Sequence, residues 1–226
     1  WKSLQVTFLY VILKVPLQTV LALGLALFVQ KETRSMAVLR SFIFAPFITS
    51  LVVVSTLWAM MYHTQHGLIN SIIRTLGLPS QTFLSNPKRA LPAITFMMIW
   101  KDVGWNMIIL LAGLKGIPRM YYEAALVDGA SRRQLFWHIT LPLLKRSLQF
   151  VVLSQSIFAF QVFVPVYVMT RGGPQDSTKV MVYYIYQNGF FFQEMGYASA
   201  LSVILLLILL AISVIQQRLT SAEPEY

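Results

Sequence analysis

The chain has 226 residues, of which 57% are hydrophobic and only 12% are charged, and its mean hydropathy is +0.65. This composition lies far outside that of a soluble domain and predicts an all-α membrane protein. The formal net charge of +10 fits Lys and Arg in the loops of a membrane protein better than a nucleic-acid partner, so no nucleic acid is expected. Because the sequence contains no Cys, it excludes a disulfide, a thiolate catalyst and a Cys-based metal site.

A membrane-spanning helix needs about 20 mostly apolar residues. Five segments of the sequence meet this requirement, and we expect them to form a polytopic helical bundle within one transmembrane domain over residues 1–226. The expected spans are residues 4–29, 38–61, 90–114, 147–169 and 196–215.

The Lys and Arg residues of the loops predict the orientation of these spans. The loop after the third span carries the largest group of them, which comprises Lys115, Arg119, Arg132, Arg133, Lys145 and Arg146. Since cytoplasmic loops carry an excess of Lys and Arg, this loop and the C-terminus with Arg218 are predicted to be cytoplasmic. The same orientation places Trp1 outside, so we expect a further span before the first residue.

The loop at residues 115–146 has the signals of a helix, a turn and a second helix. Pro118 suits the start of a helix over residues 119–127, and Gly129 is placed to end it in a left-handed conformation. Ser131 and Gln134 match a capping box at the start of the second helix, and Pro142 marks the entry to the fourth span. The loop alone would also suit an interfacial helix pair that merely joins two spans.

Three short groups of residues in this loop resemble a known motif. They are Glu123-Ala124-Ala125, Asp128-Gly129-Ala130 and Ile139-Thr140-Leu141-Pro142. Together they look like the EAA loop of binding-protein-dependent ABC importers. Residues 112–118, 170–174 and 195–200 also resemble the first of the two permeases in carbohydrate importers of the maltose, lactose and glycerol-3-phosphate type. The resemblance covers nearly the whole chain, and it departs from the family pattern in the missing first span.

This resemblance implies the type I importer permease fold and a transport subunit rather than an enzyme. In that family the EAA helix docks into a groove on a cytoplasmic ATPase. The matching residues here, which are expected to contact such an ATPase, are Glu123, Ala124, Ala125, Asp128 and Gly129. The chain has no Gly-x-x-x-x-Gly-Lys-Ser/Thr sequence, so ATP and Mg are expected on the partner ATPase subunits and no cofactor on this chain.

The resemblance also implies the remaining partners and the location. We expect a second homologous permease, two ATPase subunits or an ATPase homodimer, an extracytoplasmic solute-binding protein, membrane lipid and a sugar substrate. The complex is expected in a bacterial or archaeal cytoplasmic membrane, where the chain forms half of the translocation pathway and works by alternating access.

Polar residues inside the expected spans are candidates for substrate contact. A charge at mid-membrane costs about 2.5–3.5 kcal/mol, so Lys101 and Asp102 are expected to face a partner or a water-filled cavity. Lys101 and Trp105 are four residues apart, as are Asp102 and Asn106, so the pairs occupy adjoining strips of one helix. A Trp beside ionic and amide groups suits a sugar. The alternative is an ion pair that fixes helix packing.

Other polar residues inside the expected spans could serve either solute contact or helix packing. Gln155 and Gln161 are candidate sugar contacts, and each could instead bond a neighbouring helix. Lys14 could snorkel, pair with an acid of a partner, or face the absent span. The histidines His63, His66 and His138 have no metal-ligand partners at helical spacing, so no metal site is expected.

Three other functions compete with a sugar importer. An ion-coupled secondary transporter fragment would have acidic residues at mid-membrane, and only Asp102 fits that pattern. An integral-membrane enzyme would need a cluster of His, Asp or Glu near one face, which the sequence lacks. An ABC permease for an amino acid or peptide shares the EAA loop and stays open.

Overall fold

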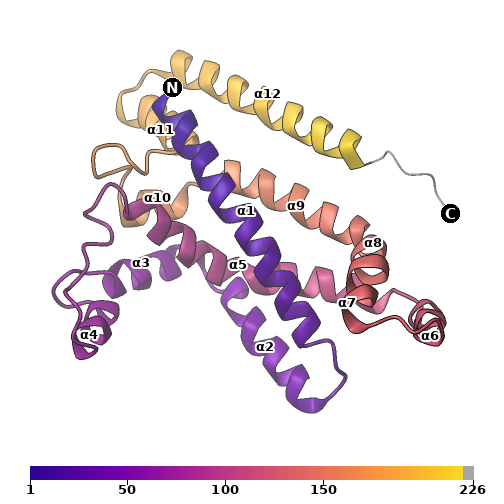
Figure 1. Ribbon diagram of the computed structural model, residues 1–226. Coiled ribbons are helices and arrows are strands. Elements are labelled where there is room, and N and C mark those ends of the chain that lie inside the picture. Colours follow the sequence, from indigo (N-terminus) through magenta and orange to yellow (C-terminus); the bar gives the residue numbers. More distant parts are fainter. Residues whose placement is uncertain (221–226) are drawn as a thin grey trace. The chain divides into compact units, whose positions relative to one another are not determined.

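The computed structural model describes residues 1–220, and every regular element in that part of the chain is a helix (Figure 1). The long helices are α1 (Lys2–Phe28), α5 (Ala90–Lys115) and α12 (Met195–Thr220). Each is long and apolar enough to cross a membrane. They coincide with the first, third and fifth expected spans, so the all-α fold class is confirmed, and these three spans are confirmed by length and composition.

The second expected span is a bent pair of helices rather than one continuous helix. It consists of α2 (Arg34–Ile48) and α3 (Leu51–Met61), whose axes differ by 95°. Pro46 lies in the last turn of α2 and has no N–H for the helix, and Ser50 has an extended ψ of 128°. The helix therefore stops and restarts, which an average of hydropathy over residues 38–61 does not reveal.

The fourth expected span is also divided. Helix α9 (Lys145–Phe160) has 16 residues, fewer than the roughly 20 that a span needs, and α10 (Val164–Met169) follows after a break. Pro165 explains the break. In a continuous helix its ring would clash with the backbone carbonyl four residues earlier, and it has no N–H to donate to that carbonyl. By length and composition the described chain has three spanning helices, or four if the bent pair is one span, which corrects the expectation of five.

Short helices fill the connections between the long ones. The loop between α3 and α5 holds α4 (Leu68–Thr75). Between α5 and α9 lie α6 (Arg119–Val127), α7 (Arg132–Leu135), the π-helical turn η1 (Phe136–Thr140) and α8 (Leu141–Leu143). Between α10 and α12 lie α11 (Met181–Tyr186) and the π-helical turn η2 (Gln187–Phe191).

The chain divides into two compact units, which are described separately. The first unit contains residues 1–15, 49–99 and the chain from Gln155. Within it α3 packs against α10, and α11 and η2 pack against α12. The Tyr62 hydroxyl donates to the carbonyl of Ala93 at 3.1 Å, and the backbone N–H of Met181 donates to the Thr7 hydroxyl at 2.8 Å. These buried bonds connect segments that are distant in sequence.

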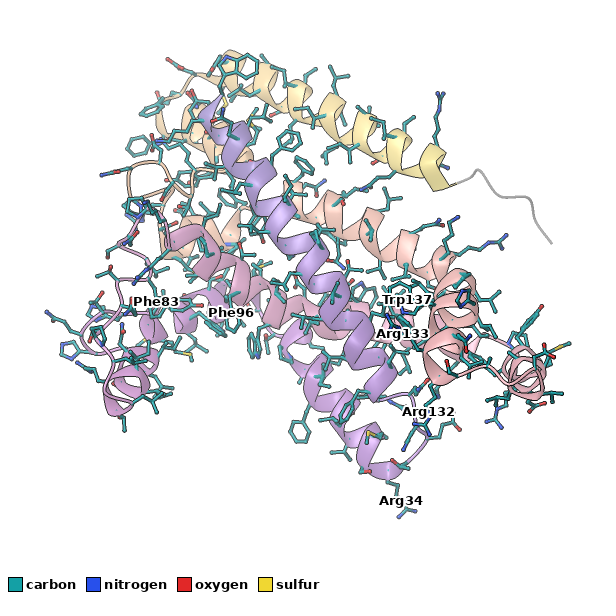
Figure 2. All side chains as sticks on the ribbon, viewed as in Figure 1. Arg34, Phe83, Phe96, Arg132, Arg133 and Trp137 are labelled. Atoms are coloured by element: carbon teal, nitrogen blue, oxygen red, sulfur yellow. The ribbon has the colours of Figure 1, made fainter. Side chains whose placement is uncertain are left out.

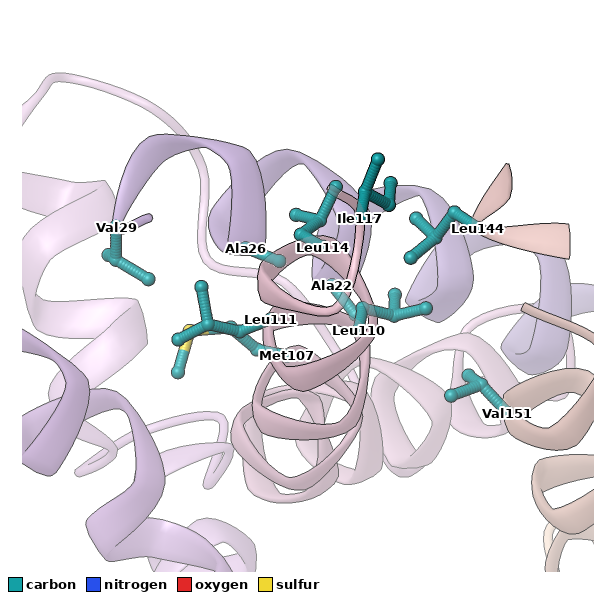
Figure 3. Packing of buried hydrophobic residues seen from close by; sticks show 10 residues of the cluster. All are labelled: Ala22, Ala26, Val29, Met107, Leu110, Leu111, Leu114, Ile117, Leu144 and Val151. Carbon is teal, nitrogen blue, oxygen red and sulfur yellow. The ribbon is translucent and has the colours of Figure 1, made fainter. Parts of the chain in front are cut away.

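The second unit contains residues 16–48 and 100–154 and has a continuous apolar core. Ala22 and Ala26 of α1 belong to this core and are fully buried. Their small side chains allow close contact between helices, which suits packing in lipid. The other core residues are Val29 directly after α1, several residues of α5, and residues of the chain that follows α5. Figure 3 labels them: Val29, Met107, Leu110, Leu111, Leu114, Ile117, Leu144 and Val151.

Two glycines let α5 approach its neighbours in the second unit. A Cβ at Gly104 would lie 2.3 Å from the carbonyl oxygen of Ile43 and 2.8 Å from the Cα of Phe44, both in α2. A Cβ at Gly113 would lie 2.3 Å from the Ser147 hydroxyl at the start of α9. The contact at Gly104 is with backbone atoms, so only a shift of α2 could accommodate a side chain there.

We therefore expect Gly104→Ala to destabilise the protein by about 1–3 kcal/mol through overpacking. Gly24→Ala in α1 is the matched control, because a Cβ there meets nothing within 4 Å. The thermal unfolding midpoint of the detergent-solubilised protein should fall for Gly104→Ala and hold or rise slightly for Gly24→Ala. Equal midpoints for the two variants would contradict the close contact between α2 and α5.

Candidate functional site

Helix α6 is an exposed helix that carries most of the residues expected to contact an ATPase, and these residues are the candidate coupling surface. It begins after Pro118, whose backbone is extended with φ −60° and ψ 136°, and ends at Asp128. Gly129 follows with φ +81°, in the left-handed region that favours glycine. Its N–H donates to the carbonyl of Leu126 at 3.0 Å, and that of Ala130 donates to Ala125 at 2.9 Å. This pair of bonds is a Schellman motif, and it confirms the predicted helix end.

The second helix of the loop starts as its sequence predicts. The Ser131 hydroxyl accepts from the backbone N–H of Gln134, and the Gln134 side chain accepts from the backbone N–H of Ser131 at 2.8 Å. The capping box is therefore present. The helix then widens into the π-helical turn η1 and continues through α8, where Pro142 stands near the N-terminus. Figure 2 labels Arg132, Arg133 and Trp137, which are exposed on α7 and η1.

One contact that the sequence did not reveal ties the two helices of the loop together. The Tyr122 hydroxyl of α6 and the Thr140 hydroxyl of η1 lie 3.1 Å apart and share a hydrogen bond. Thr140 is 6% exposed, and its hydroxyl also donates to the carbonyl of Leu135 at 3.3 Å. Thr140 belongs to the motif at residues 139–142, but its partner could be found only from the structure.

Most of the EAA residues are exposed, and they combine small side chains with two carboxylates. Glu123, Ala124, Asp128 and Gly129 are exposed, and Ala125 is half-buried. The Glu123 carboxylate has no side-chain hydrogen bond or ion pair within residues 1–220, so its oxygens are open to a partner. Exposed apolar side chains stand beside these residues on α6, namely Met120, Leu126 and Val127, which are 67%, 56% and 88% exposed.

A nearby ion pair joins the end of α5 to the loop after α1. The Lys115 ammonium donates to the Glu32 carboxylate at 2.6 Å. This hydrogen bond and the charge of Lys115 hold the pKa of Glu32 below its ordinary value. Both side chains are well exposed, so the pair contributes little to stability.

Lys101 of α5 is a candidate for substrate contact, and it contacts the C-terminal end of α2. Its side chain is 6% exposed, and its ammonium donates to the carbonyl of Phe47 at 3.0 Å. Phe47 lies in the last turn of α2, where helix carbonyls have no partner within the helix. The ammonium also lies 5.4 Å from the centre of the Phe47 ring. Lys101 therefore caps the C-terminus of α2 with a positive charge, which the helix dipole favours.

Trp105 meets the same phenylalanine. Its ring stacks on that of Phe47 with centroids 5.0 Å apart and planes at 13°, and it remains 38% exposed. The structure thus brings Lys101 and Trp105 together at Phe47. On the adjoining strip the Asn106 amide donates to the backbone carbonyl of Asp102 at 3.4 Å, and Asn106 is 2% exposed.

Gln155 and Gln161 belong to the first unit, whereas the candidates on α5 belong to the second. Gln155 is 3% exposed, and within residues 1–220 neither atom of its amide has a hydrogen bond. Gln161 is exposed at the break between α9 and α10. The assignment of these side chains to a substrate site stays a prediction.

The histidines have local roles in the structure. The His63 and His66 rings stack with centroids 5.6 Å apart, and His63 Nδ1 accepts from the backbone N–H groups of Gln65 and His66 at 3.3 Å. His138 Nδ1 lies 3.1 Å from the carbonyl of Gln134. Over residues 1–220 no group of three or more His, Asp or Glu side chains is placed to hold a metal.

Comparison with known proteins identifies the class. Residues 8–222 match the family described as "Binding-protein-dependent transport system inner membrane component". YesP of Bacillus subtilis, a probable ABC transporter permease, is 37% identical over 100% of this chain and 74% of its own length. SmoG of Agrobacterium fabrum, a sulfoquinovosyl glycerol transport permease, is 34% identical over 97% and 71%. MalF of Thermococcus litoralis, a trehalose/maltose transport permease, is 34% identical over 95% and 72%.

A solved structure shows the same fold. A chain of a bacterial alginate ABC transporter, in complex with a periplasmic protein that holds an alginate pentasaccharide, aligns with a TM-score of 0.88. It is 23% identical and covers 99% of this chain and 80% of that chain. Fold and sequence define a membrane transport subunit, not an enzyme. The chain belongs to the family of binding-protein-dependent transport system inner membrane components.

The role of Lys101 at the end of α2 is testable by stability. We expect Lys101→Met, which removes the ammonium, to leave the Phe47 carbonyl without this donor and to destabilise the protein by about 1–3 kcal/mol. Lys115→Met is the matched control, because it removes a half-exposed ammonium from an exposed pair. Thermal unfolding of the detergent-solubilised protein measures both. A Lys101→Met midpoint no lower than that of Lys115→Met would argue against the cap.

Proposed function

We propose that this chain is the permease subunit of an ATP-driven importer for a sugar or polyol. The observation that carries the proposal is the exposed helix α6, which presents most of the EAA residues on its surface. The relatives support the solute class, since their names refer to trehalose/maltose, sulfoquinovosyl glycerol, arabinooligosaccharides and sn-glycerol-3-phosphate. These solutes carry several hydroxyl groups, so the relatives favour a sugar over an amino acid or peptide.

The proposed coupling surface comprises Glu123, Ala124, Ala125, Asp128 and Gly129. Ala and Gly let the backbone of a partner approach closely, and the Glu123 carboxylate can accept charge-assisted hydrogen bonds. The partner is a pair of cytoplasmic ATPase subunits, which would bind ATP and Mg. This role requires the loop at residues 115–146, and with it the C-terminus, to be cytoplasmic.

The packing around α6 suits the transmission of a movement. The Tyr122–Thr140 hydrogen bond joins α6 to η1, and Ile117, just before α6, belongs to the apolar core of the second unit. Leu114 of α5 and Val151 of α9 belong to the same core. A displacement imposed on α6 would therefore move the ends of α5 and α9 as a packed body.

The proposed solute contacts are Lys101, Asp102, Trp105, Asn106, Gln155 and Gln161. Trp105 is the strongest of them, because its ring is partly exposed and is held flat on Phe47. Besides contacting the solute, Lys101 would fix Phe47 and hence Trp105. A second homologous permease would complete the pathway, and an extracytoplasmic solute-binding protein would deliver the solute.

The proposal is tested by ATP-dependent uptake into proteoliposomes that contain the intact complex. Labelled maltose and glycerol-3-phosphate serve as probes, and unlabelled oligosaccharides, amino acids and dipeptides serve as competitors. Competition by sugars or polyols supports the proposed solute class. Competition by amino acids or dipeptides alone would reject it while leaving the family assignment intact.

The coupling surface predicts the effect of Glu123→Ala. Loss of a charge-assisted hydrogen bond should weaken association with the ATPase about tenfold or more, since such bonds contribute about 1.5–3 kcal/mol. Glu32→Ala is the control, because it removes another exposed carboxylate of the same unit. Co-purification and solute-stimulated ATP hydrolysis measure the effect. Normal coupling in Glu123→Ala at normal expression would reject the assigned surface.

The solute path predicts that Trp105→Ala lowers uptake per assembled complex while ATPase association holds. The flat ring that would stack on a sugar is lost, and loss of one such contact should reduce uptake about tenfold, an effect of about 1.4 kcal/mol. Trp100→Ala is the control, because Trp100 lies on the same helix with a similar exposure of 41%. Equal uptake by the two variants would assign Trp105 a purely structural role.

A further inference from the structure

A groove of about 380 Å³ lies in the first unit, where the start of α5 meets the loop that follows α4. Its walls are mainly apolar and consist of Tyr62, Ile69, Phe83, Pro92, Ala93 and Phe96. Figure 2 labels Phe83 in the loop and Phe96 on α5. Phe96 is 60% exposed on a helix that is apolar enough to span a membrane, so this wall is placed to meet lipid.

Hydrogen bonds from Asn70 and Arg89 to Gln81 hold the polar part of the groove in place. Asn70 of α4 is fully buried; its amide donates to the carbonyl of Gln81 at 2.9 Å and accepts from the backbone N–H of Gln81 at 2.7 Å. The Arg89 guanidinium donates to the side-chain oxygen of Gln81. Lys88 stands next to Arg89 in the lining. The groove is therefore lined by two cations, of which Arg89 is held in place by Gln81.

These cations have no acidic counterpart nearby. Residues 33–101 contain no Asp or Glu, and neither Lys88 nor Arg89 takes part in an ion pair within the described part of the chain. Both side chains are exposed. The groove thus combines an apolar wall with an unneutralised positive rim, which is complementary to a ligand that has an apolar tail and an anionic head.

The neighbouring helix α4 indicates that this region meets a membrane surface. Leu68, Ile72 and Leu76 follow each other at intervals of four and are 57%, 54% and 71% exposed. The opposite face carries Asn70, which is fixed to the loop. A short helix with an exposed apolar stripe beside basic residues is typical of a segment that lies in the membrane interface.

We propose that this groove binds an anionic phospholipid. The phosphate lies between Lys88 and Arg89, and an acyl chain lies along Pro92 and Phe96 of α5. A sugar fits the groove less well, because the walls offer few hydrogen-bonding groups and the Tyr62 hydroxyl already donates to the carbonyl of Ala93. The bound lipid would fix α4 and the start of α5 to the membrane surface.

The rim is tested with the double variant Lys88→Gln/Arg89→Gln in the intact complex. The control is Arg74→Gln, since Arg74 is an exposed cation of α4 that donates to the carbonyl of Gln65 and does not line the groove. The complexes are placed in nanodiscs of phosphatidylcholine with phosphatidylglycerol, and retained lipid is measured by native mass spectrometry. We expect the double variant to retain about tenfold less phosphatidylglycerol than the control, because the control keeps both cations that line the groove, and cations next to a bound headgroup strengthen binding of anionic lipid.

The wall is tested with Phe96→Ala, and Phe42→Ala is the matched control, since both rings are exposed, at 60% and 71%. Phe96→Ala alone should lower phosphatidylglycerol retention. The proposal is overturned if the double variant retains as much phosphatidylglycerol as Arg74→Gln, or if the wild-type complex retains phosphatidylcholine equally well. It is also overturned if the double variant loses capture of the solute-binding protein while phosphatidylglycerol retention is unchanged.

Discussion

The almost fully buried ammonium of Lys101 donates to the backbone carbonyl of Phe47 at the end of α2. A buried charge in a spanning helix is expensive, and so is a helix end whose carbonyls have no donor. The bend between α2 and α3 creates such an end, and Lys101 of α5 supplies a donor for it at 3.0 Å. The broken span and the charge on α5 thus depend on each other. Gly104 lets α2 come close enough for this contact, because its missing Cβ leaves room for the backbone of Ile43.

The coupling surface depends on a different kind of interaction, in which residues close in sequence supply the hydrogen bonds that helix ends lack. The Schellman motif after α6 and the capping box before α7 satisfy the open ends of both helices with residues that are adjacent in sequence. The Tyr122–Thr140 bond and the core residue Ile117 then fix the pair to the second unit. Because the backbone is satisfied internally, the exposed Glu123 carboxylate and the apolar side chain of Val127 are left for a partner.

This difference explains what could be predicted from the sequence. The helix at residues 119–127, the left-handed Gly129 and the capping box depend on nearby residues, so their patterns predicted them correctly. The broken spans were missed because hydropathy is averaged over a window and takes no account of Pro165 or of the extended Ser50. The partner of Lys101 was unpredictable for another reason, since Phe47 lies 54 residues away in sequence. The sequence showed that Lys101 needs a partner but could not show which atom supplies it.

Buried polar side chains of α1, α5 and α9 differ in whether they have a hydrogen-bond partner, and the difference bears on transport. The Lys101 ammonium donates to the Phe47 carbonyl, whereas the amide of Gln155 is 3% exposed and forms no hydrogen bond within residues 1–220. The same holds for Gln18 of α1, which is fully buried. An unsatisfied buried amide costs about 1–3 kcal/mol, which a rigid scaffold gains nothing by keeping. A transporter that alternates between conformations gains from such groups. A bound solute, or another conformation, can supply the missing partner, and the state that does so is then favoured over the state without a partner. In the proposed complex, a solute or the second permease would supply the bonds that the Gln155 amide does not make within residues 1–220.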